Sequence, residues 1–248
     1  MNSVIYVMWL RQLKRYWRSK ARMIGTLGQP ILFLVALGFG LGAVFQQAGQ
    51  GNYIEFLAPG IIAMSVLFTA MFNGIEIIWD RQFGFLKETL VAPVPRIKIM
   101  IGRTLGGATV AFCQGIFIGI ISLFLGFHIT NPMNIPLALL FMFLTAFLFT
   151  AVGVAIASLL KDMNAFPLII NFVIMPLFFL SGALFPINDI PKFLEAIIKI
   201  NPLSYGVDGI RGALTTSAFG LHIDFIVLCI WIFAASAIGS YLFSKIEI

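Results

Sequence analysis

Residues 136–159 read PLALLFMFLTAFLFTAVGVAIASL, and this stretch carries no charged side chain. The hydrocarbon core of a bilayer is about 30 Å thick, so a helix of about 20 apolar residues can cross it. Lipid offers the backbone no hydrogen-bond partners, and a helix satisfies its own N–H and C=O groups. The stretch therefore predicts a membrane-spanning helix.

Five further apolar stretches have a similar length and composition. The six predicted spans cover residues 24–45, 56–79, 104–127, 136–159, 165–185 and 223–244. The chain of 248 residues is 60% hydrophobic and 10% charged, whereas a soluble domain is about one quarter charged. The spans take up most of the sequence. We therefore predict a single all-α transmembrane domain over residues 1–248, without a separate soluble domain.

Lysine and arginine are distributed unequally between the two ends of the predicted spans. Of the 16 such residues, 13 lie before the first span, in or beside the two loops on that side, or after the last span, and 3 lie opposite. Basic residues gather on the cytoplasmic side of membrane proteins. Both termini are therefore predicted in the cytoplasm, in a multi-pass protein of the plasma or inner membrane. The net charge of +6 follows the membrane boundary and does not indicate nucleic-acid binding.

The segment before the first span, residues 3–22, has the pattern of one amphipathic helix. At about 100° per residue, its basic side chains converge on one face. These side chains are Arg11, Lys14, Arg15, Arg18 and Arg22. A helix of this kind lies in the membrane interface, with its basic face toward headgroups or protein. Two interpretations stay open, a topology anchor or an elbow that also contacts a cytoplasmic partner.

The second cytoplasmic loop is more apolar than a connector needs to be. Residues 79–96 read WDRQFGFLKETLVAPVPR, in which Phe83, Leu86 and Leu90 share helical spacing. The prolines that follow cannot continue a helix interior. We predict a short amphipathic helix over residues 80–92, which either rests on lipid or docks into a cytoplasmic protein.

The outer loop, residues 186–222, is too apolar for a solvated loop and too interrupted for a span. Asp189 stands two residues before Pro191 and Asn201 directly before Pro202, and both pairs are typical of helix starts. We predict two short re-entrant helices in this loop. Backbone that enters the membrane without crossing it is tolerated only where protein covers it or where it lines a cavity. Asp208 and Arg211 are three residues apart and are expected to pair.

Glu76 is predicted about one turn from the cytoplasmic end of the second span. A carboxylate inside a membrane indicates function by default. Here it either pairs with Arg81 or Arg103, or transmits movement from the neighbouring helix. The pairs Gly38/Gly42 and Gly115/Gly119 favour close helix packing, within this chain or at a subunit interface.

The residues for catalysis, metal binding and ATP binding are missing from the sequence. Ser181 and His222 lie at span ends without a general base near them, and two Cys and two His form no metal-ligand cluster. No GxxxxGK[ST] phosphate loop occurs. The chain is therefore predicted not to be an enzyme by itself and to hold no metal. If ATP drives it, the ATPase is another polypeptide.

Residues 178–214, FFLSGALFPINDIPKFLEAIIKINPLSYGVDGIRGAL, together with residues 80–96, complete a pattern that covers nearly the whole chain. The chain resembles the membrane subunit of ABC-2-type ABC transporters, close to the daunorubicin-resistance and nodulation-export permeases. The resemblance implies two permease subunits, identical or different, and two ATPase subunits that bind ATP and Mg. It implies an exporter of amphiphiles such as drugs, lipids or lipid-linked glycans.

The resemblance also assigns roles along this sequence. Residues 80–92 look like the family's coupling helix, 3–22 like its connecting helix, and 189–215 like its paired outer helices. The implied coupling residues are Asp80, Arg81, Phe83, Leu86, Lys87 and Leu90. From their own positions in the sequence, Glu76, Asp208 and Arg211 are the candidate gating or structural polar residues. The implied pathway-lining residues are Phe33, Phe68, Phe72, Asn171, Met175 and Phe179.

Two functions from other classes remain as alternatives. A self-contained secondary transporter or channel is expected to show internal repeats or ionisable residues near mid-membrane, and we find neither. A membrane assembly factor is expected to have no transport activity.

Overall fold

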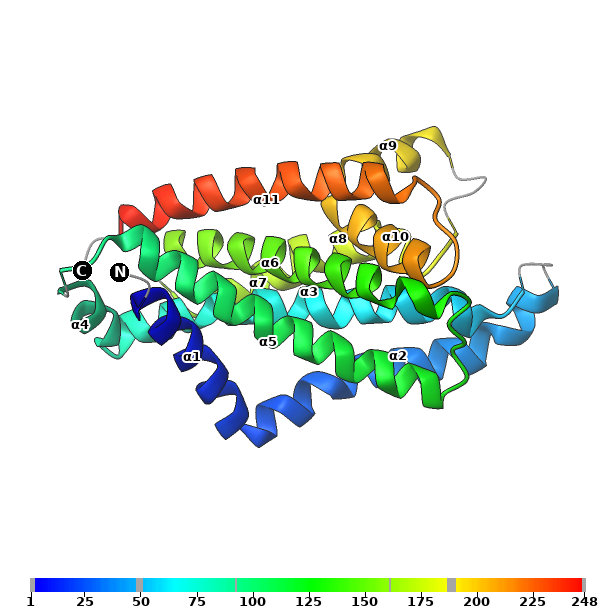
Figure 1. Cartoon of the computed structure of the whole chain (residues 1–248), viewed down its shortest axis with the longest axis horizontal. Coiled ribbons are helices and arrows are strands. Elements are labelled where there is room, and N and C mark those ends of the chain that lie inside the picture. Colours follow the sequence, from blue (N-terminus) through cyan, green and yellow to red (C-terminus); the bar gives the residue numbers. More distant parts are fainter. Residues whose placement is uncertain (1–2, 48–50, 92, 161, 187–190, 247–248) are drawn as a thin grey trace.

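The computed structural model describes residues 3–47, 51–91, 93–160, 162–186 and 191–246, and within these ranges it contains helices and no strands. The long helices lie side by side along the longest axis of the molecule (Figure 1). Among the described residues, five helices are long and apolar enough to cross a membrane. They are α2 (Lys20–Gln47), α3 (Tyr53–Gln82), α5 (Arg96–Phe124), α6 (Ile135–Leu159) and α11 (Leu221–Ser244). These helices confirm five of the six predicted spans by length and composition.

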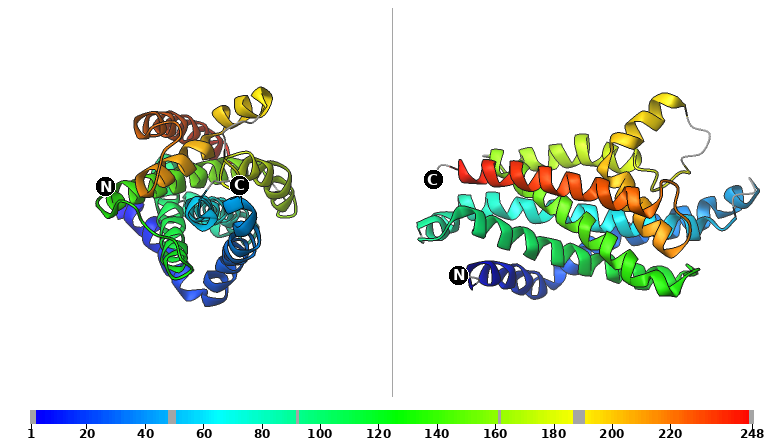
Figure 2. Two further views of the ribbon diagram at one scale, coloured as in Figure 1. Left: turned by 90° about the vertical axis from the view of Figure 1, so that its right-hand side faces the viewer. Right: turned by 45° about the horizontal axis from the view of Figure 1, so that its top comes forward.

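Helix α3 forms the centre of the bundle. Nearly every residue of α3 is buried, whereas α2 and α11 leave most of their surface open. The end-on view shows α3 in cyan among α2, α5 and α6 (Figure 2). Gly74 of α3 meets Gly153 of α6 so closely that a Cβ at Gly74 would overlap the Gly153 carbonyl. This close approach packs α3 tightly against α6.

The predicted span 165–185 is helical only over its first 15 residues. It consists of α7 (Ala165–Ile169), a π-helical turn (Ile170–Ile174) and α8 (Met175–Phe179). Pro176 has no N–H to donate, and the N–H of Met175 just before it bonds five residues back to Ile170. After Phe179 the chain turns, with Gly182 at a φ of 70°. The helix is thus about 22 Å long, shorter than the bilayer core.

The predicted single helix 3–22 is wrong in its continuity. Helix α1 (Ser3–Arg18) ends at Arg18 and α2 begins at Lys20, so the two helices meet at an elbow at Ser19 (Figure 1). Helix α1 packs on α5, where Gly102 and Gly106 leave no space for a Cβ against the α1 side chains and backbone. The apolar face of α1 therefore rests on protein.

The predicted helix 80–92 begins in the wrong place. Helix α3 continues through Asp80 to Gln82, the chain turns at Gly84 with a φ of 76°, and only then does α4 (Phe85–Val91) begin. The predicted last residue, 92, lies outside the described residues. The two prolines that were predicted to end the helix are followed directly by α5. Asp80 and Arg81 therefore belong to the central helix rather than to the short one.

The end of the bundle opposite α4, which the sequence predicts to be the outer end, is built by α9 (Lys192–Ile200) and α10 (Pro202–Leu214). The Asn201 side chain accepts from the N–H of Leu203 at 2.9 Å, which confirms the predicted helix start there. Asp189 lies outside the described residues. Helix α10 is buried against α3, α6 and α11, while α9 projects from the bundle (Figure 2). The chain begins and ends at the opposite end of the molecule, near α4 (Figure 1).

Candidate functional site: a charged junction beside the short helix α4

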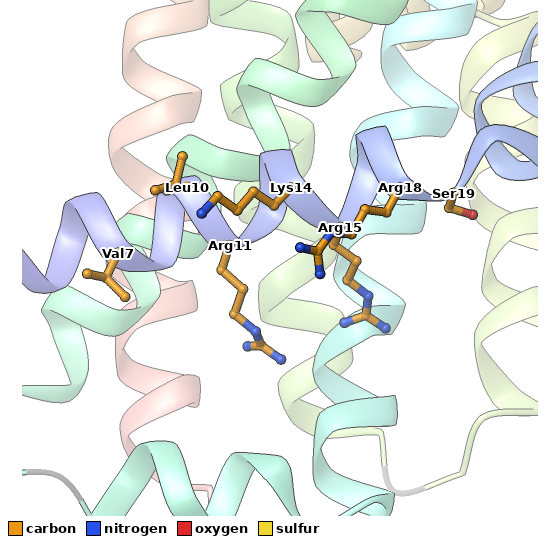
Figure 3. A pocket seen from close by; sticks show the side chains of 7 residues that line it. All are labelled: Val7, Leu10, Arg11, Lys14, Arg15, Arg18 and Ser19. Atoms are coloured by element: carbon orange, nitrogen blue, oxygen red, sulfur yellow. The ribbon is translucent and has the colours of Figure 1, made fainter.

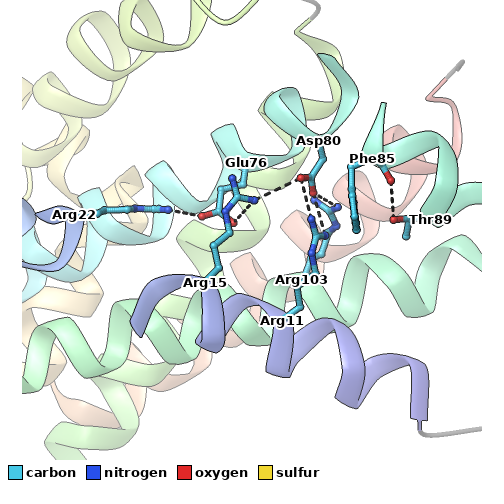
Figure 4. Close-up of polar contacts among 8 residues, drawn as sticks. All are labelled: Arg11, Arg15, Arg22, Glu76, Asp80, Phe85, Thr89 and Arg103. Carbon is cyan, nitrogen blue, oxygen red and sulfur yellow. Dashed lines mark hydrogen bonds and ion pairs between the residues drawn. The ribbon is translucent and has the colours of Figure 1, made fainter. Parts of the chain in front are cut away.

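Two buried carboxylates mark the last turns of α3. Glu76 and Asp80 are 2% and 5% exposed, and a spacing of four residues places them on the same face of the helix. Four arginines converge on them from three other helices (Figure 4). They are Arg11 and Arg15 of α1, Arg22 of α2 and Arg103 of α5. We call these six residues the charged junction.

Asp80 is the centre of the charged junction. Arg11 donates to both of its oxygens, from Nη2 to Oδ1 at 3.0 Å and from Nη1 to Oδ2 at 3.2 Å. Arg103, which is 2% exposed, also donates to Oδ2 of Asp80. Paired guanidinium and carboxylate groups of this geometry are the strong kind of hydrogen bond. Asp80 therefore ties α1 and α5 to α3.

Glu76 connects the elbow between α1 and α2 to the same helix. Arg22 donates to Glu76 and also, at 3.1 Å, to the side chain of Asn73. Arg15 lies between the two carboxylates, 3.6 Å from Oε2 of Glu76 and 3.5 Å from Oδ1 of Asp80. The pairing predicted for Glu76 with Arg81 or Arg103 is therefore wrong, because Glu76 pairs with Arg15 and Arg22 on either side of the elbow instead.

The charged junction extends to α4 through Arg11. Its guanidinium lies 4.0 Å from the ring centroid of Phe85, the first residue of α4, which is a favourable cation–π arrangement. Arg11 thus contacts α3 and α4 from its position on α1 (Figure 4). Farther along α1, burial raises the pKa of Tyr16 to about 12, so its hydroxyl stays protonated and donates to Gln114 of α5.

The outer face of α1 carries a hollow of about 720 Å³ with a basic lining (Figure 3). Arg11 and Arg15 line it but also reach α3. Lys14 and Arg18 line it as well and make no ion pair within the described part of the chain. These two cations are thus exposed and have no ion-pair partner among the described residues, while the predicted contact of this face with headgroups stays a prediction.

The predicted coupling residues do not share one environment. Leu86 is 1% exposed and packs in the core of this chain, whereas Phe83 is 81% exposed, and Lys87 is also exposed. Arg81 turns away and donates to the carbonyls of Leu160 at 3.0 Å and Ser158 at 3.3 Å, at the end of α6. The side chain of Leu90 lies outside the described residues.

The predicted pair of Asp208 and Arg211 at the outer end is wrong. Asp208 accepts from Ser217 Oγ at 2.8 Å and from the backbone N–H groups of Ala218 and Phe219. Arg211 donates to the carbonyls of Gly182, Ala183 and Phe56, and its guanidinium lies 4.0 Å from the centroid of the Phe56 ring. Asp208 is bonded to the loop that follows α10, and Arg211 is bonded to backbone carbonyls of α3 and of the turn after α8. The two side chains therefore do not pair with each other.

These contacts make Arg211 the link between α10, α3 and the turn after α8. Burial lowers the pKa of Arg211 to about 10, which still leaves it charged near neutral pH. The carboxylate of Asp224, in the first turn of α11, is completely buried.

The six predicted lining residues lie in three different environments. Phe68 and Phe72 line a cavity of about 120 Å³ between α2 and α3, which is too small for a drug or lipid. Phe33 and Met175 are partly buried against the core, while Asn171 and Phe179 are exposed. Within a single chain these residues do not line a common passage.

The spans and the charged junction define a helical membrane protein with a short helix at the end where the chain begins and ends. Comparison with known proteins narrows this class to one family. The family model for the ABC-2 type transporter matches residues 3–215, and the chain belongs to this family.

The relatives carry the names of transport permeases or of a nodulation protein. Nodulation protein J of Rhizobium leguminosarum bv. viciae is 31% identical over 223 residues, covering 87% of this chain and 85% of that protein. The inner membrane transport permease YadH of Escherichia coli K12 is 30% identical over 233 residues, covering 91% and 89%. The putative transport permease ycf38 of Cyanophora paradoxa is 29% identical over 214 residues, covering 84% and 72%. Two of these three relatives are thus named as transport permeases.

Proposed function

We propose that this chain is the membrane-spanning permease subunit of an ATP-driven exporter. A separate ATPase subunit binds ATP and Mg and hydrolyses the ATP, and a second permease subunit, identical or different, completes the pathway. The cargo is an amphiphile, such as a drug, a lipid or a lipid-linked glycan, that leaves the cytoplasm or the inner leaflet. Membership of the ABC-2 type transporter family supports this assignment.

The observation that carries the proposal is the position of α4. This helix of seven residues is joined to the end of α3 by a glycine turn, and its first residue contacts Arg11 of the charged junction. Its segment exposes Phe83, Phe85 and Val91, three apolar side chains that an aqueous environment would penalise. A cleft in an ATPase subunit would cover them, while the buried Leu86 holds α4 to the bundle.

In this mechanism ATP-driven closure of two ATPase subunits displaces α4. The charged junction joins α4 and α3 to α1, α2 and α5, so these helices shift with it. The spans then expose the cargo alternately to the cytoplasmic leaflet and to the outside. The exposed Asn171 and Phe179 suit a pathway that forms between two permease subunits rather than inside one.

The test is co-purification of an ATPase subunit with the tagged chain. The ATPase is sought first in the neighbouring reading frame, where its phosphate loop identifies it. Phe83→Asp is expected to weaken ATPase binding about tenfold or more, since a docking aromatic often contributes over 1.4 kcal/mol. Met133→Asp is the matched control, because Met133 is equally exposed and lies at the other end of the bundle.

Undiminished co-purification by the Phe83→Asp variant would overturn the docking of this segment. Transport of a labelled amphiphile by the purified chain alone, without ATP, would support a secondary transporter or channel instead. No transport with a bound, active ATPase across a panel of amphiphiles would favour an assembly factor.

A further inference from the structure

A groove of about 440 Å³ runs between α5 and α11 on the outside of the bundle. Its walls are Met100 and Ile101 of α5 and Phe233 and Tyr241 of α11, with Phe147 of α6 also lining it. The groove exists because α11 presents small side chains, such as Ala237, toward α5. Its lining is mostly apolar.

The groove has the length of one leaflet. It extends along α11 from Phe233 to Ser244, which at 1.5 Å per residue is about 16 Å. Half of the hydrocarbon core of a bilayer is about 15 Å. Ser244 is the last residue of α11, and Ile97 near the start of α5 lines the same end. The groove thus begins at the membrane surface and ends near the midplane.

Two cations stand at the surface end of the groove. Arg96 donates to the backbone carbonyls of Ser244 and Ile246, and the Lys245 ammonium lies 4.5 Å from the ring centroid of Tyr241. No carboxylate of the described residues pairs with either cation. An apolar groove as long as one leaflet is deep, with cations at its surface end, is complementary to a molecule with an acyl chain and an anionic headgroup. Basic pockets between spanning helices bind anionic headgroups in this way.

We propose that this groove binds one anionic phospholipid, with an acyl chain between α5 and α11 and its phosphate at Lys245 and Arg96. The site is separate from α4 and from the proposed pathway. It requires neither an ATPase nor a cargo, so it stands or fails independently of the proposed function.

The test uses the purified full chain in detergent micelles doped with phosphatidylglycerol or with phosphatidylcholine. Phosphatidylglycerol is expected to raise Tm by about 3 °C more than phosphatidylcholine does. A cation near anionic headgroups contributes about 1 kcal/mol, which shifts Tm by about that much in a chain of this size. Native mass spectrometry is expected to show one retained phosphatidylglycerol per chain.

Two variants address the two halves of the site. Ala237→Phe fills the groove from an exposed position, and Lys245→Gln removes a cation at its rim. Ala237→Phe is expected to abolish the extra 3 °C and the retained lipid, whereas Lys245→Gln, which leaves Arg96 in place, is expected to reduce both. Leu32→Phe on the exposed face of α2 and Lys192→Gln on α9 are the matched controls, and both are expected to keep them.

Equal effects of the two lipids on the unaltered chain would overturn the proposal. So would a preference for phosphatidylglycerol that Lys245→Gln leaves undiminished, because the headgroup would then bind elsewhere. If Ala237→Phe changes the oligomeric state and not lipid retention, a second copy of the chain occupies the groove and the proposal is wrong. Lys245→Gln alters an exposed side chain and decides the matter even if the phenylalanine variant does not fold.

Discussion

At the scale of single residues, Arg103 is the side chain whose pairing matters most for the stability of the protein. It is buried in the bundle, and its charge is compensated through Asp80. A buried pair contributes little over an apolar pair of the same volume, but a buried charge that loses its partner costs about 3–5 kcal/mol. The two members of this pair are not equivalent, since Asp80 also has Arg11 and Arg15.

Asp80→Asn is therefore expected to destabilise the protein by about 3 kcal/mol, because the isosteric amide leaves Arg103 without a counter-charge. Arg103→Met is expected to cost clearly less, since Asp80 keeps its two arginines of α1. Thermal unfolding of the purified variants measures both. The double variant should recover part of the loss of Asp80→Asn, as coupled neighbours do. Additive effects would show that the two residues do not stabilise each other.

At the scale of helices, the spacing of glycines proved a weaker guide than their contacts. A Cβ at Gly42 would meet nothing within 4 Å, so that half of the predicted Gly38/Gly42 packing pair has no partner in this chain. At Gly115 a Cβ would crowd Val66 and Met142. Two very close backbone approaches, of Gly60 to Ala183 and of Gly74 to Gly153, belong to neither predicted pair. A GxxxG motif records spacing on one helix, whereas a contact also needs a partner helix at that height.

Gly74→Ala is expected to destabilise the bundle by about 3 kcal/mol, because the added methyl meets a backbone carbonyl that cannot rotate away. In a chain of this size that loss lowers Tm by about 8 °C. Gly42→Ala is the matched control and should leave Tm unchanged or raise it slightly, since alanine favours a helix. A Tm for Gly74→Ala within a degree of that control would show that α3 and α6 are farther apart than described.

At the scale of the whole molecule, the sequence predicts most of the helices and little of how their charges meet. Twenty apolar residues in a row specify a span without reference to any partner, which is why five spans were confirmed. The helix after Ala165 falls short because Pro176 and Gly182 act locally inside an apolar run. The partners of Glu76 and Arg211 depend on which helices pack together. A single sequence does not record that packing, so both predicted pairings failed.

The orientation of the bundle remains a prediction from the count of basic residues, and single thiols test it. After Cys113 and Cys229 are replaced by alanine, Phe83→Cys and Met133→Cys each present one thiol to a membrane-impermeant maleimide. Phe83 and Met133 are 81% and 89% exposed, so the side of the membrane, rather than burial, decides their labelling. In intact cells the cysteine at 133 should react and the one at 83 should not, and both should react after permeabilisation. Labelling at 83 in intact cells would place α4 outside, where no ATPase subunit can reach it.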